Sequence, residues 1–189
     1  MIKEARRGIL LFLASLVAGF LLLWTELELR FSTEILFIIP SILAIIAGSY
    51  IREGFNEISV DGYRAGEYIF RYATLLFAGI IVLQERSSSY IIYISGIVIL
   101  ISALLFLFFG TLFLGVAVRQ VGKMNNETLS KIAGNLIEVS LVFTVFDLGL
   151  MFVFPSSKYY LFFVPLLVLF SLVLAYIGLG RVKEGKMIP

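Results

Sequence analysis

The sequence contains no cysteine and no histidine. Their absence excludes disulfide bonds, iron–sulfur clusters, thiolate nucleophiles, histidine-ligated haem and Ser-His-Asp catalysis, and it removes the ligands that most zinc sites use. Carboxylates, lysines and tyrosines remain as groups on which an enzyme could be built. Because few of them fall within the apolar segments, we expect no enzymatic activity, no resident metal ion and no cofactor.

Charged residues are also scarce. They make up 15% of the 189 residues, whereas 60% of the residues are hydrophobic and the mean hydropathy is +1.04. A soluble domain has about 45–50% apolar residues and about 25% charged residues. The composition therefore predicts an integral membrane protein whose solvent is the lipid bilayer. The length allows one membrane domain, residues 1–189, and no sizeable soluble domain beside it.

Six apolar segments alternate with charged or polar breaks along the chain. A membrane-spanning helix needs about 20 apolar residues, with a range of about 17–25. The pattern thus predicts an all-α fold, a polytopic membrane helix bundle of six transmembrane helices. The predicted spans are residues 8–24, 35–51, 65–83, 90–118, 132–154 and 159–180.

Two of these spans leave an alternative open. The third contains Glu67 and Arg71, and without them it is too short to cross a bilayer. Five spans and an interfacial helix at residues 66–71 are therefore the alternative. The fourth carries no charge and is longer than one straight crossing requires, so it tilts, continues past the bilayer as a helix, or breaks near Gly110.

The basic residues predict the orientation, because lysine and arginine concentrate in short cytoplasmic loops. With six spans, only Arg30, Arg86 and Lys158 fall on the outer side. We expect both termini in the cytoplasm and the protein in the plasma membrane. The basic surface follows from this topology, so we expect no nucleic-acid partner. The basic residues of the inner side are Lys3, Arg6, Arg7, Arg52, Arg64, Arg119, Lys123, Lys131, Arg181, Lys183 and Lys186.

The second, fourth and sixth predicted spans end in similar sequences. They read "GSYIREG" from Gly48, "GVAVRQVG" from Gly115 and "GLGRVKEG" from Gly178. A glycine followed by a basic residue suits a helix C-terminus, and it also suits anionic lipid headgroups. Two explanations stay open, a repeat of three helical hairpins and three helix ends that became alike independently.

Three segments resemble a known family: "IREGFNEIS", "LGVAVRQVGKMNNETLSKIAGNLIEV" and "LAYIGLGRV". They are similar to an archaeal family of multispanning membrane proteins, domain-of-unknown-function family 973. The resemblance covers residues 51–182 and rests on turn and helix-end motifs. The family pattern has a glycine pair after the "NN" turn, whereas this chain has Ala133-Gly134-Asn135. The resemblance implies an archaeal plasma-membrane protein, and it supplies no catalytic residues.

Charged side chains within the predicted spans are the candidate functional residues. Glu67 and Arg71 are four residues apart, so they share a helix face and can pair. Glu138 has the same predicted depth as Arg71. We therefore predict a polar clamp in which Arg71 pairs with Glu138, Glu67 is a second acceptor, and Asn135 donates a hydrogen bond to Glu138. A static clamp that fixes helix packing is favoured over a transport role.

Asp147 differs from this group. It follows Glu138 by nine residues, which places it on the opposite face of a helix and about 13 Å further along the axis. No basic residue within a span matches its depth. Three interpretations remain: a neutral or hydrated acid, a contact to a partner subunit, and a proton or cation site.

These observations predict a non-catalytic membrane protein. The expected role is an accessory or scaffold subunit of a larger membrane complex, for example an energy-converting one. Its partners would be the lipid bilayer and other membrane subunits or further copies of itself. The alternative is a small transporter or channel for an ion, proton or small solute that uses Glu138, Asp147 and Arg71.

Overall fold

A computed structural model describes residues 1–29, 34–84, 90–153 and 160–182. Side chains in these ranges are described except at 23, 24, 26–29, 34, 35, 84, 91, 145–153 and 160–164. The described residues form helices and turns without any strand, which confirms the predicted all-α bundle. The elements are α1 (Ile2–Leu29), the short 3₁₀ helix η1 (Glu34–Phe37), α2 (Ile38–Phe55), α3 (Val60–Gln84), α4 (Tyr90–Met124), α5 (Thr128–Val153) and α6 (Tyr160–Arg181).

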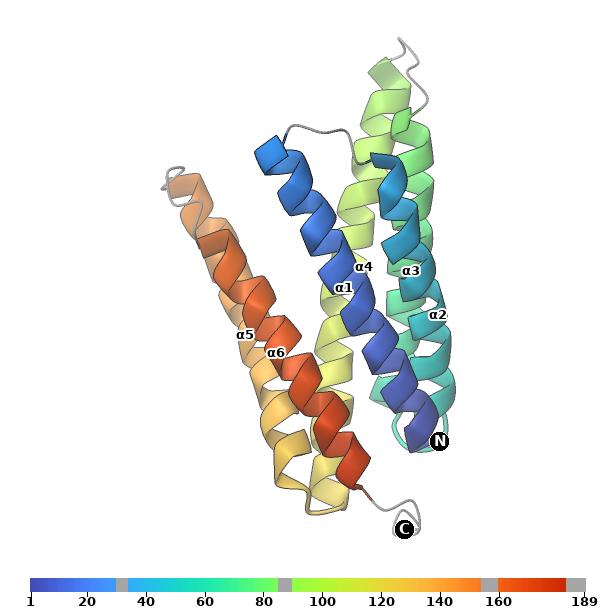
Figure 1. Ribbon diagram of the computed structural model, residues 1–189, viewed down its shortest axis with the longest axis vertical. Coiled ribbons are helices and arrows are strands. Elements are labelled where there is room, and N and C mark those ends of the chain that lie inside the picture. Colours follow the sequence, from blue (N-terminus) through green and yellow to red (C-terminus); the bar gives the residue numbers. More distant parts are fainter. Residues whose placement is uncertain (30–33, 85–89, 154–159, 183–189) are drawn as a thin grey trace.

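The six α-helices form a ring in chain order. Each packs against the next one along the chain, and α1 packs against α6, which closes the ring. The start of α1, the α2–α3 turn, the α4–α5 turn and the end of α6 lie together at one end (Figure 1). We call this the basal end. Toward the opposite end, α5 and α6 diverge from α3 and α4.

The helices are suited to a membrane. Among the described residues, four segments are long and apolar enough to cross one: Ile2–Leu22, Ile38–Phe55, Val60–Leu83 and Ile92–Met124. The chain is therefore a membrane protein, while the number of six crossings stays a prediction.

Two alternatives left open by the sequence are resolved. The helix α3 runs unbroken from Val60 to Gln84, so the short interfacial helix at residues 66–71 is wrong. The helix α4 passes through Gly110 and continues to Met124, so a break at this glycine is also wrong. Polar and charged residues extend both helices toward the basal end, beyond the apolar segments that predicted them.

The packed core lies in the basal half of the bundle. It contains fully buried apolar side chains from all six α-helices. Because lipid tails are as apolar as these side chains, burial from water does not hold the helices together in a bilayer. Close packing and short helix–helix distances must do so. The largest core side chains are Ile9, Phe12, Ile51, Phe55, Ile69, Leu114, Val118, Val121, Ile137, Leu172 and Leu179.

Glycines provide those short distances. A Cβ atom added to Gly66 of α3 would lie 2.3 Å from the backbone nitrogen of Arg52 on α2. One added to Gly54 of α2 would lie 2.2 Å from the backbone nitrogen of Ala5 on α1. Such distances are far shorter than any van der Waals contact, so the three backbones touch only because glycine has no side chain.

The α2–α3 and α4–α5 hairpins repeat one packing arrangement. An added Cβ at Gly66 would lie 2.6 Å from the Gly48 carbonyl oxygen and 2.3 Å from the Arg52 nitrogen. One at Gly134 would lie 2.5 Å from the Gly115 carbonyl oxygen and 2.7 Å from the Arg119 nitrogen. The residues Gly48, Arg52 and Gly66 thus correspond in place to Gly115, Arg119 and Gly134.

The similar sequence at the end of α6 has a different neighbour. Gly178 lies closest to Ser130 of the preceding helix, α5, and α6 is the last helix that the structure describes. Gly185 lies outside the described residues. The shared arrangement is therefore that of the α2–α3 and α4–α5 hairpins, and the repeat of three hairpins stays a prediction.

Candidate functional site

At the basal end, hydrogen bonds between polar side chains link the α2–α3 turn to α4. The Ser59 hydroxyl precedes α3 and accepts a hydrogen bond of 3.3 Å from the Gly62 N–H, which is the usual N-cap contact. The same hydroxyl donates to Oε1 of Gln120 on α4 at 2.7 Å, and Gln120 Nε2 donates to Asp61 Oδ2 at 2.9 Å. These bonds fix the start of α3 against α4.

The α4–α5 turn is held in a similar way. Asn126 has a φ of 52°, in the left-handed region that asparagine tolerates better than most residues. The carboxylate of Glu127 then accepts a 2.7 Å hydrogen bond from the Ser130 N–H and caps α5. Lys131 Nζ donates to Asn126 Oδ1 at 2.9 Å. Local side-chain bonds therefore define how α5 leaves the turn.

An ion pair joins α4 to α5 above this turn. Arg119 Nη1 lies 2.9 Å from Glu138 Oε2, and the two side chains are 31% and 23% exposed. The preceding residues, Val118 and Ile137, are fully buried in the core. One residue turns a helix by about 100°, so the ion pair lies at the edge of the α4–α5 interface and not in the core.

A second ion pair lies on α3. Arg71 Nη2 pairs with Glu67 Oε1, as their spacing of four residues predicts, and the side chains are 53% and 38% exposed. The Arg71 guanidinium also lies 5.9 Å from the ring centre of Phe106 on α4. This pair is therefore on the lateral surface of the bundle, beside α4.

The predicted clamp between Arg71 and Glu138 is wrong. The prediction rested on the equal depth of the two residues. However, α3 packs against α2 and α4, whereas Glu138 lies on α5 and pairs across the α4–α5 interface, on the side of α4 away from α3. The true partner, Arg119, was assigned to a cytoplasmic loop because the predicted fourth span ended at Val118. The helix continues, and side chains tilt toward the N-terminus of their helix, so Arg119 reaches back to Glu138.

The predicted contact of Asn135 with Glu138 is also not formed. Asn135 is exposed, and Glu138 Oε1 is buried without a hydrogen-bond partner among the described residues. The backbone at Asp147 belongs to α5, but its side chain lies outside the described residues. The three interpretations of Asp147 therefore stay predictions. Within the described part of the chain, no three acidic side chains come together as metal ligands would.

Arg6 is a residue that the sequence patterns did not single out. It was counted only among the basic residues of the N-terminal tail. Its guanidinium lies 4.6 Å from the ring centre of Tyr176 on α6, and its Nε donates to the Tyr176 carbonyl oxygen at 3.3 Å. Because these residues are 170 positions apart, no local pattern could have paired them.

A comparison with models of known protein families identifies the family of the chain. The model described as "Protein of unknown function (DUF973)" matches residues 8–187. The chain belongs to this family. The match extends over α1, which the resemblance at residues 51–182 did not include. Searches of curated proteins and of solved structures give no significant match.

Because the two hairpins pack alike, the ion pair between Arg119 and Glu138 can be introduced at the matching positions of the α2–α3 hairpin. Phe70 occupies the place in α3 that Glu138 occupies in α5, four residues after the packed glycine. In Phe70→Glu, we expect the new carboxylate to pair with Arg52. The single variant Phe70→Glu should therefore lose less unfolding free energy than Phe70→Glu combined with Arg52→Leu. A double-mutant cycle in unfolding free energy should give a coupling of about 1 kcal/mol between positions 52 and 70. With Phe70→Gln in its place, a coupling of the same size would contradict the ionic explanation.

Proposed function

We propose that this membrane protein is a non-catalytic scaffold or accessory subunit of a larger membrane assembly. In this proposal it crosses the plasma membrane six times with the basal end in the cytoplasm. Its partners are other membrane subunits or further copies of itself, and it has no enzymatic activity of its own.

The observation that supports the proposal is where the charged groups of the helices lie. Both ion pairs are at lateral edges of the bundle, at Glu67–Arg71 and Arg119–Glu138. Among the described residues, no Asp, Glu, Lys or Arg is fully buried, and the buried polar residues are serines and one threonine. Transport sites place charged groups toward the bundle interior or a water-filled path. Charges on the lateral surface instead suit recognition of a neighbouring membrane protein.

A transporter or channel is the second candidate. It is favoured by Glu138 Oε1, which is buried without a hydrogen-bond partner among the described residues. An unsatisfied carboxylate oxygen in a helix is a group that could accept a proton or contact a cation. In this alternative Glu138 and Asp147 would be separate carboxylate positions along α5, and Arg71 would act elsewhere, since it pairs with Glu67 on α3.

Gentle extraction and native mass spectrometry separate the two candidates. We expect the protein to leave its native membrane in stoichiometric association with another membrane protein or with further copies. Replacing both Glu67 and Arg71 by leucine should weaken that association, whereas Val142→Leu, at an exposed apolar position, should not. Recovery as a monomer that moves ions across liposomes, with the flux lost in Glu138→Gln or Asp147→Asn, would show that the second candidate is correct.

A further inference from the structure

Arg6 is held in a fixed position between the first and last helices. Its guanidinium stacks on the Tyr176 ring, with 4.6 Å between Cζ and the ring centre. Its Nε donates to the carbonyl oxygen of the same residue at 3.3 Å. Stacking and hydrogen bonding together restrict a side chain that is otherwise one of the most mobile in proteins. The arginine is therefore preorganised.

Gly180 makes room for this arrangement. A Cβ atom added to Gly180 would lie 2.8 Å from both Cζ and Nη2 of Arg6. The flat guanidinium thus lies between the ring of Tyr176 and the bare backbone of Gly180, one helical turn further along α6. Even an alanine at position 180 would push the guanidinium out of this place.

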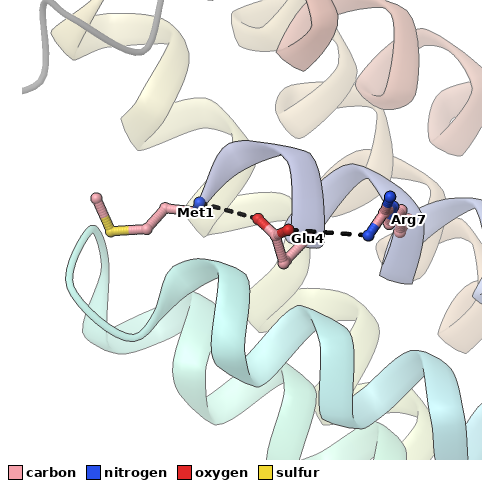
Figure 2. A network of polar contacts seen from close by, with 3 residues as sticks. All are labelled: Met1, Glu4 and Arg7. Atoms are coloured by element: carbon pink, nitrogen blue, oxygen red, sulfur yellow. Dashed lines mark hydrogen bonds and ion pairs between the residues drawn. The ribbon is translucent and has the colours of Figure 1, made fainter.

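The charge of Arg6 is not neutralised within the described part of the chain. No carboxylate there lies within ion-pair distance of it. The neighbouring Arg7 differs, because its Nη1 lies 3.9 Å from Glu4 Oε1 in the network of Figure 2. Glu4 also accepts a 2.9 Å hydrogen bond from the amino group of Met1. Toward the residues that the structure describes, Arg6 donates through Nε alone, which leaves its terminal N–H groups to an anion.

The position of Arg6 indicates which anion this is. It lies on the second turn of α1 at the basal end, in the first turns of the candidate span Ile2–Leu22, and the predicted topology puts this end at the membrane surface. The anions concentrated at that depth are lipid phosphates. A guanidinium can bind two phosphate oxygens through parallel N–H groups. We propose that Arg6, fixed by Tyr176 and Gly180, binds the phosphate of an anionic lipid headgroup at the seam of α1 and α6.

This binding has a structural consequence. The helices α1 and α6 are the first and last of the ring, so their contact joins two helices that are not consecutive in the chain. A lipid phosphate at Arg6 would neutralise its charge and hold the first and last helices together. Bound lipid should therefore stabilise the fold.

Thermal unfolding of the full-length protein in a neutral detergent tests the proposal. After delipidation, phosphatidylglycerol at ten times its Kd should raise the Tm by about 3–5 °C, and native mass spectrometry should detect the bound lipid. Arg6→Gln and Gly180→Ala should each lose most of this rise. The second variant keeps every charge and lies at an exposed position in the last turn of α6, where alanine favours the helix.

Two control variants separate the loss of the Arg6 site from a loss of charge or an added methyl group elsewhere. Arg7→Gln removes a charge from the same turn, and Gly19→Ala adds a methyl group whose nearest neighbour, Pro40 Cβ, is 4.0 Å away. Both should keep the lipid response. Equal responses in Arg6→Gln and Arg7→Gln would overturn the proposal. A full response to inorganic phosphate alone would also overturn it. So would a lipid response that appears only after removal of residues 183–189, because a carboxylate of that segment, such as Glu184, would then be the anion at Arg6.

Discussion

Gly66→Ala is expected to destabilise the protein by about 2 kcal/mol, although alanine is the better helix former by about 1 kcal/mol. The added methyl group would lie 2.3 Å from the backbone nitrogen of Arg52, and backbone cannot rotate away as a side chain can. The helices α2 and α3 must therefore separate. In a bilayer, where close packing rather than burial from water holds helices together, this separation removes a main source of stability.

Gly19→Ala is the matched control for this prediction. Among the described side chains, the same methyl group at position 19 meets nothing closer than Pro40 Cβ at 4.0 Å, so the gain in helix propensity should remain. The two variants should change the unfolding free energy in opposite directions, measured by equilibrium unfolding in mixed detergent micelles. If Gly66→Ala were as stable as Gly19→Ala, the backbone contact between α2 and α3 would not exist as described.

Because Gly134 occupies the matching place in the α4–α5 hairpin, the destabilisation expected for Gly66→Ala is also expected for Gly134→Ala. An added Cβ there would lie 2.5 Å from the Gly115 carbonyl oxygen and 2.7 Å from the Arg119 nitrogen. Gly134→Ala should therefore lower stability about as much as Gly66→Ala. The two sites are in different hairpins, so their effects should add in the double variant.

Much of the fold could be predicted because bilayer thickness imposes it. Apolar segments of about 20 residues separated by charge predict helices and their order along the chain. The helix ends at the basal side could not be predicted in this way. Residues such as Arg119 and Gln120 are polar yet helical, because α4 continues along α5 with glycine contacts at Gly122 and Gly134. Their side chains also bond to neighbouring elements, Arg119 to Glu138 and Gln120 to Ser59.

The candidate site was harder to predict, because the sequence indicates how deep a residue lies in the membrane but not which neighbouring helix its side chain faces. Hydropathy placed Arg71 and Glu138 at one level, and the pairing of these two followed from that level alone. Which neighbour a helix face meets depends on the order of helices in the ring and on their rotation. A glycine such as Gly134 sets that rotation by admitting a neighbouring backbone, and this is not visible in a hydropathy pattern.

The ion pair of Arg119 with Glu138 carries the second large expected effect. Removing one partner from a partly buried pair leaves the other charge without compensation where water reaches it only in part. Since the side chains keep 31% and 23% of their surface exposed, we expect a loss of about 1–3 kcal/mol for Arg119→Leu, less than for a fully buried pair. Glu138→Gln should lose less, because the amide is neutral and can still accept from Arg119.

A double-mutant cycle measures the pair itself. Arg119→Leu combined with Glu138→Leu should recover much of the stability lost in either single leucine variant, with a coupling energy of at least 1 kcal/mol. The same cycle with Arg71 in place of Arg119 should give a coupling within about 0.5 kcal/mol of zero, since Arg71 pairs with Glu67. A strong coupling of Arg71 to Glu138 would instead mean that α3 and α5 meet. The order of helices around the ring would then be different, and the lateral position of both charge pairs, on which the proposed scaffold role depends, would no longer hold.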